Sequence, residues 1–294
     1  MLLLGLVLLS GFVAQPASAF PEPPMSLEQA CAGADLIVVG TLGGIAEEKS
    51  PEQKVGHLPR MIGSITVQSV LYGHPPEGGV KIWAWDVLPP GQPLPACSGP
   101  CPCVGKEGKE WIWCLNKLPD GVWRVDHTQK VIMTDKKGEI EKAVQARLAP
   151  ERALLEKAPA VDLCHTGLIL DGLLEVSPAG QAYVRLLKAG PAALPCAREL
   201  LMACKNPAAR AWGCLLLGNL QSGRQGVDAL KSLLDSSDRV PLDFDGMETV
   251  GTMRKGDSLT LGVVALQSLG TLAGEEFKTV QEAKAWCDAQ TKGK

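Results

Sequence analysis

The residues with the clearest chemical potential are four closely spaced cysteines, Cys97, Cys101, Cys103 and Cys114. Four thiolates can hold a zinc ion in tetrahedral geometry, and a thiolate stabilised by a cation or a helix terminus can be redox-active. The two-residue spacing between cysteines that is usual in zinc sites is absent, and the sequence Cys-Pro-Cys stiffens the chain. We therefore expect structural disulfide bonds here, with a thiol-based or metal-binding site as the alternative.

The chain contains ten cysteines, divided equally between its two halves. An even total is typical of disulfide pairing in an oxidising compartment, but each half holds an odd number, so either one bridge joins the halves or each keeps a free thiol. The disulfide candidates of the first half are Cys31, Cys97, Cys101, Cys103 and Cys114. We expect the thiols of the second half to be partly buried and unpaired, because free cysteine behaves as a small core hydrophobe.

Other candidates for catalysis or metal binding are weak. Cys164 and His165 are adjacent, and adjacent side chains on a helix or strand point apart, which argues against a catalytic dyad. Residues 243–246 are similar to half of a calcium loop, but Pro241 and Thr252 stand where that loop requires its ligands. The sequence contains no P-loop, dinucleotide fingerprint, G-x-S-x-G or H-E-x-x-H motif. It therefore predicts no enzyme, no cofactor and no bound metal.

Residues 1–19 have the character of a secretory signal peptide. The segment is uncharged, contains an apolar run from Leu2 to Leu9 and ends in Ala17-Ser18-Ala19. Its apolar core is too short to cross a bilayer. The formal charge of −3 on the whole chain gives no electrostatic footprint for nucleic acid or an acidic membrane surface. We expect an exported protein, periplasmic or extracellular, that does not contact a membrane after signal cleavage.

Residues 20–135 are predicted to form a small β-barrel. Five runs of strand-forming residues are separated by turn signals, at 35–44, 63–72, 80–87, 110–118 and 122–133. In the fourth run, Trp111, Trp113 and Leu115 share one face, while Ile112 and Cys114 share the other. Five tryptophans cannot all fit inside so small a barrel, so some should form an exposed contact face. The candidates for that face are Trp83, Trp85, Trp111 and Trp113.

The rest of the chain is rich in leucine and alanine and is predicted to be helical. Residues 136–160 should form a helical linker that Pro150 breaks or kinks. Further helices are expected at 182–187, 197–203, 208–221, 226–234, 258–271 and 279–288. Leu216–Leu220 recurs with small changes as Ser268–Leu272, beyond a polar insertion at 237–257. Such an echo indicates helical repeats, in which each helix pair buries its face against its neighbours.

The first half resembles the netrin-like domains, the family of the tissue inhibitors of metalloproteinases. The resemblance lies in residues 26–42, with their Ala-Asp and Val-Gly, and in residues 66–73, 103–113 and 121–125. It implies a five-stranded barrel of the OB type. The inhibitors begin with a cysteine that chelates the zinc of the target, whereas the predicted mature chain here begins at Phe20. Inhibition or modulation of a peptidase through residues 88–105 is therefore an alternative function.

The second half resembles HEAT-like repeat proteins in residues 208–220 and 226–235, and again from 269 to 286. The resemblance implies an α-α superhelix with a grooved surface that binds another protein. The expected domains are a signal peptide (1–19), a netrin-like OB-fold β-barrel (20–135), a helical linker (136–160) and a HEAT-like region (161–294). Together these patterns predict a two-domain β-then-α protein that is a non-catalytic protein–protein interaction module. The alternatives are a peptidase inhibitor or modulator and a thiol- or metal-binding protein that uses the Cys97–Cys114 cluster.

Overall fold

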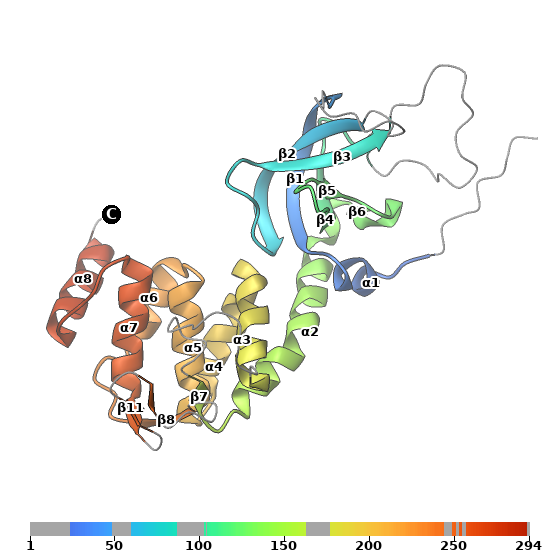
Figure 1. Cartoon of the computed structure of the whole chain (residues 1–294). Helices are drawn as coiled ribbons and strands as arrows, with labels where there is room; N and C mark the ends of the chain where they lie inside the picture. The colour runs from blue at the N-terminus through green and yellow to red at the C-terminus, as the bar shows by residue number, and fades with distance from the viewer. Residues whose placement is uncertain are drawn as a thin grey trace, which may run out of the picture.

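The computed structural model describes residues 24–48, 60–86, 103, 105–162, 177–243, 249–250, 253–254 and 257–292. Figure 1 shows a β-barrel followed by a region of packed helices. The predicted signal peptide lies outside the described residues, as do Cys97, Cys101, Cys164 and His165.

Five strands close into the barrel. They are β1 (Leu36–Glu47), β2 (Arg60–Tyr72), β3 (Val80–Asp86), β4 (Glu110–Lys117) and β5 (Trp123–Arg124). Their order is β1-β2-β3-β5-β4, and the pairing of β1 with β4 completes the ring. β3 and β5 run parallel, whereas the other neighbours are antiparallel. This is an OB-like barrel, as the sequence predicts.

The last predicted strand, residues 122–133, is not continuous. It divides into β5, a 3-10 turn at Thr128–Lys130 and the short strand β6 (Val131–Ile132), which pairs with β4. His127 caps the turn, since its Nδ1 accepts a hydrogen bond of 3.2 Å from the backbone N–H of Gln129. Such side-chain bonds to the backbone compete with strand pairing, which explains the interruption.

β1 is buried on both of its faces. Leu36 and Val38 point into the barrel, whereas Ile37 and Val39 point outward into the core shared with the helices. All four side chains are almost fully buried. Because successive residues of a strand face opposite sides, this stretch of barrel wall separates two hydrophobic cores.

β4 is divided in the same way, and this confirms the predicted faces. Trp113 and Leu115 belong to the barrel core, and Trp111 packs against it. Ile112 and Cys114 belong to the core on the helical side. The indole N–H of Trp113 donates a hydrogen bond of 2.9 Å to the carbonyl oxygen of Gly40, so the polar atom of this fully buried side chain is satisfied.

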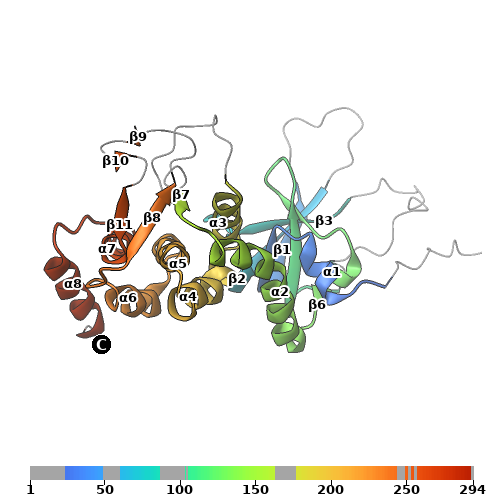
Figure 2. The same cartoon turned by 90° about the horizontal axis from the view of Figure 1, so that it is seen from below.

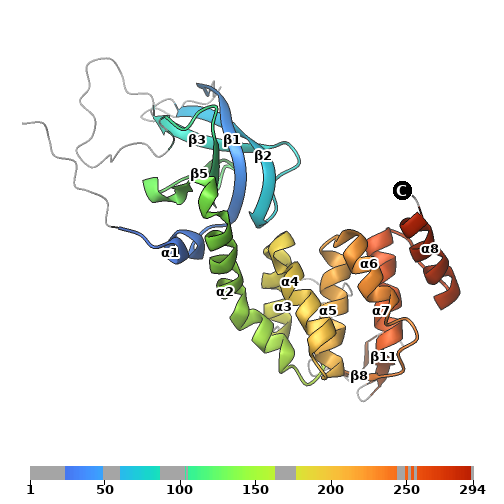
Figure 3. The same cartoon turned by 180° about the vertical axis from the view of Figure 1, so that it is seen from behind.

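Two helices, α1 (Leu27–Ala32) and α2 (Lys137–Glu156), cover the outer apolar face of the barrel. The predicted capping box of α1 is present, with reciprocal hydrogen bonds between Ser26 and Gln29. α2 continues through Pro150 with a bend in its axis, so the predicted disruption is not a break (Figure 3). Pro150 itself is exposed. Leu148 before it and Leu155 after it are buried in the same hydrophobic core, so the helix stays packed on both sides of the proline.

The remaining helices form two layers. They are α3 (Pro178–Lys188), α4 (Leu194–Ala203), α5 (Pro207–Asn219), α6 (Gly223–Lys231), α7 (Leu261–Ala273) and α8 (Val280–Lys292). Figure 2 shows α3, α5 and α7 in one row and α2, α4, α6 and α8 in the other, so successive helices alternate between layers. All the predicted helices are present, although residues 258–260 are extended instead of helical.

The polar insertion contains strands that the sequence did not reveal. β8 (Arg239–Asp243) pairs with β11 (Ser258–Thr260) on one side and with β7 (Val161–Asp162) on the other. Two further strands, β9 (Thr249–Val250) and β10 (Met253–Arg254), pair with each other. A proline in the middle of β8 masks its strand character, and its pairing partners come from distant parts of the chain.

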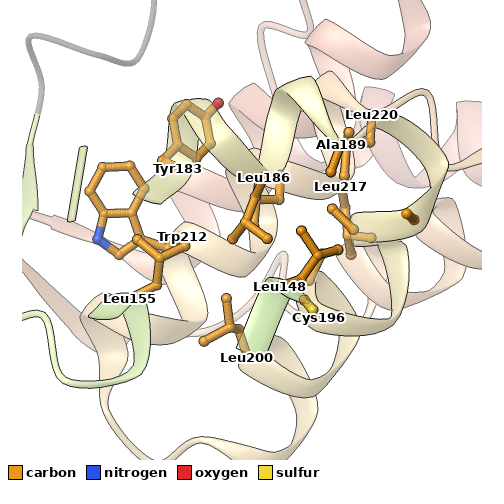
Figure 4. Packing of buried hydrophobic residues seen from close by; sticks show 14 of the residues in the cluster. Leu148, Leu155, Tyr183, Leu186, Ala189, Cys196, Leu200, Trp212, Leu217 and Leu220 are labelled. Carbon is orange, nitrogen blue, oxygen red and sulfur yellow. The ribbon is translucent and has the colours of Figure 1, made fainter. Parts of the chain in front are cut away.

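α5 lies at the centre of the helical region and is buried on nearly all sides. Figure 4 shows Trp212 of α5 beside Tyr183 of α3, with a ring-centroid distance of 5.1 Å. The Trp212 indole N–H donates to the carbonyl oxygen of Ala160 at 3.3 Å. An apolar helix surface of this kind is stable only when neighbouring helices cover it, and α4 and α7 do so here.

The two segments of the internal echo pack against each other. Gly218 of α5 faces the backbone of Ser268 in α7, and a Cβ atom on Gly218 would lie 2.7 Å from the carbonyl oxygen of Ser268. That distance is too short for a real contact, so the absence of a side chain at Gly218 sets how closely α5 and α7 approach.

Direct hydrogen bonds join the barrel to the helical region. The backbone N–H of Gly73, at the end of β2, donates to the carbonyl oxygen of Ala189 at 2.9 Å. On α2, Nη1 of Arg147 donates to the carbonyl oxygens of Cys31 (2.8 Å) and Ala34 (2.9 Å). The same guanidinium lies 4.1 Å from the centre of the Tyr72 ring. Arg147 therefore ties α2 to α1, to the start of β1 and to β2.

Replacing Gly218 with alanine should lower the free energy of unfolding. Overpacking a tight site costs about 1–3 kcal/mol, which exceeds the roughly 1 kcal/mol that alanine gains over glycine in a helix. Gly138→Ala is the matched control, because a Cβ on this exposed glycine of α2 meets no atom within 4 Å. That control should gain less than about 1 kcal/mol, because Gly138 lies in the first turn of α2 and not in the middle of the helix. Urea unfolding measures both, and a gain for Gly218→Ala would contradict the close approach of α5 and α7.

Replacing Arg147 with methionine should also destabilise the protein. The variant loses two charge-assisted hydrogen bonds, worth about 1.5–3 kcal/mol, but keeps an apolar stem against Tyr72. Arg185→Met is the control, since the Arg185 side chain is mostly exposed and forms one ion pair, with Glu151, that should contribute about 1 kcal/mol or less. Urea unfolding at neutral pH compares the two. Equal losses would show that Arg147 is only a surface charge.

Candidate functional site

The four tryptophans of the predicted contact face do not form one surface. Trp113 is fully buried inside the barrel, so it cannot belong to an exposed face. Trp83 and Trp111 are half-buried, and the side chain of Trp85 lies outside the described residues. The alternation of β4 places Trp113 on the same face as Leu115, and the closure of the barrel makes that face the inner one.

A cation covers each of the two half-buried tryptophans. Nζ of Lys106 lies 3.9 Å from the centre of the Trp111 ring, and Cζ of Arg60 lies 6.0 Å from the centre of the Trp83 ring. Arg60 also forms ion pairs of 2.8 Å with Glu48 and Asp120, and these hold its position. Cation–π contacts of this kind stabilise the barrel wall itself and leave little free aromatic face for a partner.

The two described cysteines of the predicted Cys97–Cys114 cluster lie on opposite sides of the barrel wall. Cys103 belongs to the core inside the barrel, whereas Cys114 belongs to the core on the helical side. Within the described ranges, no three side chains of His, Cys, Asp or Glu lie together in a way that could hold a metal ion. Cys97 and Cys101 lie outside those ranges.

The described cysteines of the helical half, Cys196, Cys204, Cys214 and Cys287, are free thiols. Three are buried and Cys204 is half-buried, which confirms the expectation for these four. Burial raises the pKa of each thiol, and it raises the pKa of Cys214 to about 12. Because the thiolate is the reactive form, these side chains pack as core residues and are not suited to thiol chemistry.

The two described histidines are engaged in structural hydrogen bonds. Nε2 of His74 lies 2.8 Å from the carbonyl oxygen of Leu187, and Nδ1 of His127 caps the turn at Thr128–Lys130. Neither is therefore placed as the base of a nucleophilic dyad.

The surface best suited to a ligand is a groove where the barrel meets the helical region. It has a volume of about 650 Å³. The groove is lined by Val70, Leu71, Gly138, Glu141, Lys142, Val144, Gln145, Pro191, Ala192 and Pro195. These residues come from β2, α2 and the segment that leads from the 3-10 helix η4 (Gly190–Ala193) into α4. We call it the junction groove.

The walls of the junction groove are fixed to one another. Nε2 of Gln145 on α2 donates a hydrogen bond of 2.8 Å to the carbonyl oxygen of Ala192. Gly190 has a φ of +62°, and a Cβ there would lie 2.5 Å from the carbonyl oxygen of Gly73. Only glycine fits this combination of positive φ and close approach, so the chain can turn tightly from α3 into the groove wall beside β2.

One edge of β2 lies open beside the junction groove. Residues 60–65 of β2 pair with β3, but residues 66–72 pair with β1 alone. Among the described strands, none pairs with the other edge of this second stretch. Val70 and Leu71 at the end of the open stretch also line the groove. The site therefore combines apolar walls with backbone hydrogen-bonding groups.

Sequence reasoning did not identify the junction groove. Its residues come from three separate parts of the chain, and none of them belongs to a recognisable motif. The only local signal is the pair Pro191 and Pro195, which lie in the first turns of η4 and α4 and could have indicated a rigid segment.

The comparisons with known proteins give no further assignment. No family model, no curated protein and no solved structure matches this chain. Within the part of the chain that the structure describes, no helix is both long and apolar enough to cross a membrane. The architecture that can be stated is therefore an OB-like barrel joined through α2 to a two-layered helical region.

Proposed function

We propose that this protein is a non-catalytic interaction module that binds an extended segment of another protein in the junction groove. One observation carries the proposal: the groove is built jointly by the barrel and the helices, and it lies beside an open strand edge. A binding site at the contact of two substructures is a common arrangement.

The lining of the groove defines the side chains that would fit. Its apolar walls include Val70, Val144, Pro191 and Pro195, which suit aliphatic side chains of a partner. The exposed Glu141 and Lys142 on α2 supply one charge of each sign at the rim. The volume of about 650 Å³ matches a few side chains and not a large folded domain.

The open edge of β2 favours an extended partner. A peptide that adds to a strand edge makes main-chain hydrogen bonds for affinity, while alternate side chains enter neighbouring pockets for specificity. Residues 66–70 of β2 would supply the edge, and the groove at Val70 and Leu71 would receive the side chains. A helical partner would leave these backbone groups without strand partners.

The finer classification rests on the resemblances in the sequence. We propose that the barrel is of the netrin-like class. The resemblance in residues 26–42 supports this class, and the strand order is that of an OB-like barrel. The helices would form a HEAT-like array, supported by their alternation between two layers and by the contact between the echo segments at Gly218 and Ser268. With residues 1–19 as an export signal, the partner would be a periplasmic or extracellular protein.

A side chain added at Gly138 should block the groove without disturbing the fold. Gly138 lines the groove and is exposed, and a Cβ on it meets no atom within 4 Å. We expect Gly138→Trp to weaken binding at least tenfold for 12-residue peptides selected on the full-length protein from a random library. Gly138→Ala is the matched control and should bind as the wild type does. Fluorescence anisotropy measures the affinities, and thermal unfolding checks both variants.

Hydrogen exchange then tests the binding mode. A peptide added to the edge of β2 should slow amide exchange within residues 66–70. Peptides that bind the wild type and Gly138→Trp equally would refute the junction groove as the site. Unchanged exchange in β2, combined with loss of binding in Gly138→Trp, would refute the extended mode alone.

A further inference from the structure

Two cysteines from distant parts of the sequence meet at the outer face of the barrel. Cys31 lies in the last turn of α1, and Cys114 lies in the middle of β4, opposite Ile37 of β1. Both are free thiols in this structure, and their side chains interact with each other. Both are buried, with exposed fractions of 1% and 0%. No sequence motif links the two, because Cys31 stands alone in its segment.

The backbone is fixed on both sides of this contact. The N–H of Asp35 donates to the carbonyl oxygen of Leu115 at 2.9 Å, and Oδ2 of Asp35 accepts a bond of 2.9 Å from the N–H of Lys117. Arg147 holds the carbonyl oxygen of Cys31 at 2.8 Å. The two cysteines are therefore held together by their main chains and not only by the rotamers of their side chains.

The two thiols are not equivalent. The hydrogen bond from the Cys114 thiol, aided by the nearby charge of Arg147, lowers the pKa of Cys31. The same hydrogen bond, together with burial, raises the pKa of Cys114 well above its usual value. While α1 is docked, the proton therefore stays on Cys114, and Cys31 is the thiol of the pair that ionises more readily.

We propose that Cys31 and Cys114 form a disulfide bond in the oxidised protein and that this bond fastens α1 to the barrel. The contact already brings these two segments of the chain together, and both side chains are buried in the same core. Cys31 and Cys114 would then not be available as partners for Cys97, Cys101 or Cys103.

The oxidant is a small disulfide such as glutathione disulfide, which accepts the two electrons that the two thiols lose. The Cys31 thiolate attacks one sulfur of the reagent, the S–S bond of the reagent breaks, and the departing thiolate takes a proton from water. Cys114 then gives its proton to water, and its thiolate attacks the Cys31 sulfur of the mixed disulfide. The second reagent thiolate leaves and is protonated. Two protein thiols lose two electrons, and one reagent disulfide becomes two thiols.

Burial determines when this reaction can occur. A reagent cannot reach either sulfur while α1 covers them, because both side chains have almost no exposed surface. The bond therefore forms while α1 is displaced, during folding, and resists reduction once α1 has docked. α1 has only six residues, too few to be a stable helix by itself, so a covalent link would have a large effect on its retention.

Peptide mapping without reduction tests the bond directly. The full-length protein is refolded with glutathione disulfide, its remaining thiols are blocked in acid, and it is cleaved with trypsin. Cys31 is the only cysteine before Lys49, Cys114 is the only one between Lys109 and Lys117, and Cys97, Cys101 and Cys103 share one peptide. We expect the Cys31 peptide linked to Glu110–Lys117. If the Cys31 or the Cys114 peptide is linked instead to the peptide that holds Cys97, Cys101 and Cys103, the proposal is wrong. It is also wrong if Cys31 and Cys114 both carry the blocking group.

Thermal unfolding with and without a phosphine reductant gives an independent test. A bond that closes the loop between Cys31 and Cys114 should raise Tm by on the order of 10 °C. Reducing the protein in denaturant before it is refolded should abolish this increase in Tm. Cys31→Ser and Cys114→Ser should each remove this difference, and the double variant should remove no more than either one. Cys214→Ser is the control: it loses a buried thiol but should keep the full reductant effect. Additive losses in the double variant would refute a shared bond.

Discussion

The structure depends on one constraint: part of the barrel wall is apolar on both of its faces. β1 places Leu36 and Val38 inside the barrel and Ile37 and Val39 outside it, and β4 is divided in the same way. An OB-like barrel fills its own interior, but the outer face needs a separate cover. α1 and α2 provide that cover, and the apolar core then continues through the helical layers as far as Cys287. The barrel and the helices are thus joined by a shared core and not only by a linker.

That shared core also explains where the junction groove lies. α2 must pack its buried face on the barrel wall and on the helices at the same time. The exposed side of its first turns, near Gly138 and Glu141, therefore faces the gap between β2 and η4. Gln145 and Gly190 keep η4 beside β2. The groove is consequently a product of the docking of α2, and any change that loosens α2 should also change the shape of the groove.

The cysteines show how one residue type takes different roles according to its surroundings. Cys214 is isolated in the middle of α5, where burial keeps its thiol protonated. Cys103 fills space inside the barrel. Cys31 and Cys114 lie in the same apolar surroundings as the helical thiols, but they face each other, and that contact alone makes them candidates for a bond.

The sequence by itself determined the local structure. The strands β1 to β4 of the barrel, the capping box at Ser26, the helices and the two faces of β4 all follow from periodicity and capping, which depend on neighbouring residues. It could not determine the course of residues 122–133, the continuity of α2 through Pro150 or the burial of Trp113, since each is decided by contacts with distant segments.

The tertiary structure alone decided the rest. It placed Gly218 against Ser268, brought Cys31 to Cys114 and assembled the junction groove from β2, α2 and η4. The internal echo indicated that the segments around Gly218 and Ser268 belong to repeated helices, but no pattern in the sequence indicated the cysteine contact or the groove. These arrangements form because strands and helices that are apolar on two faces must be covered on both. Which element covers the second face depends on how the whole chain packs.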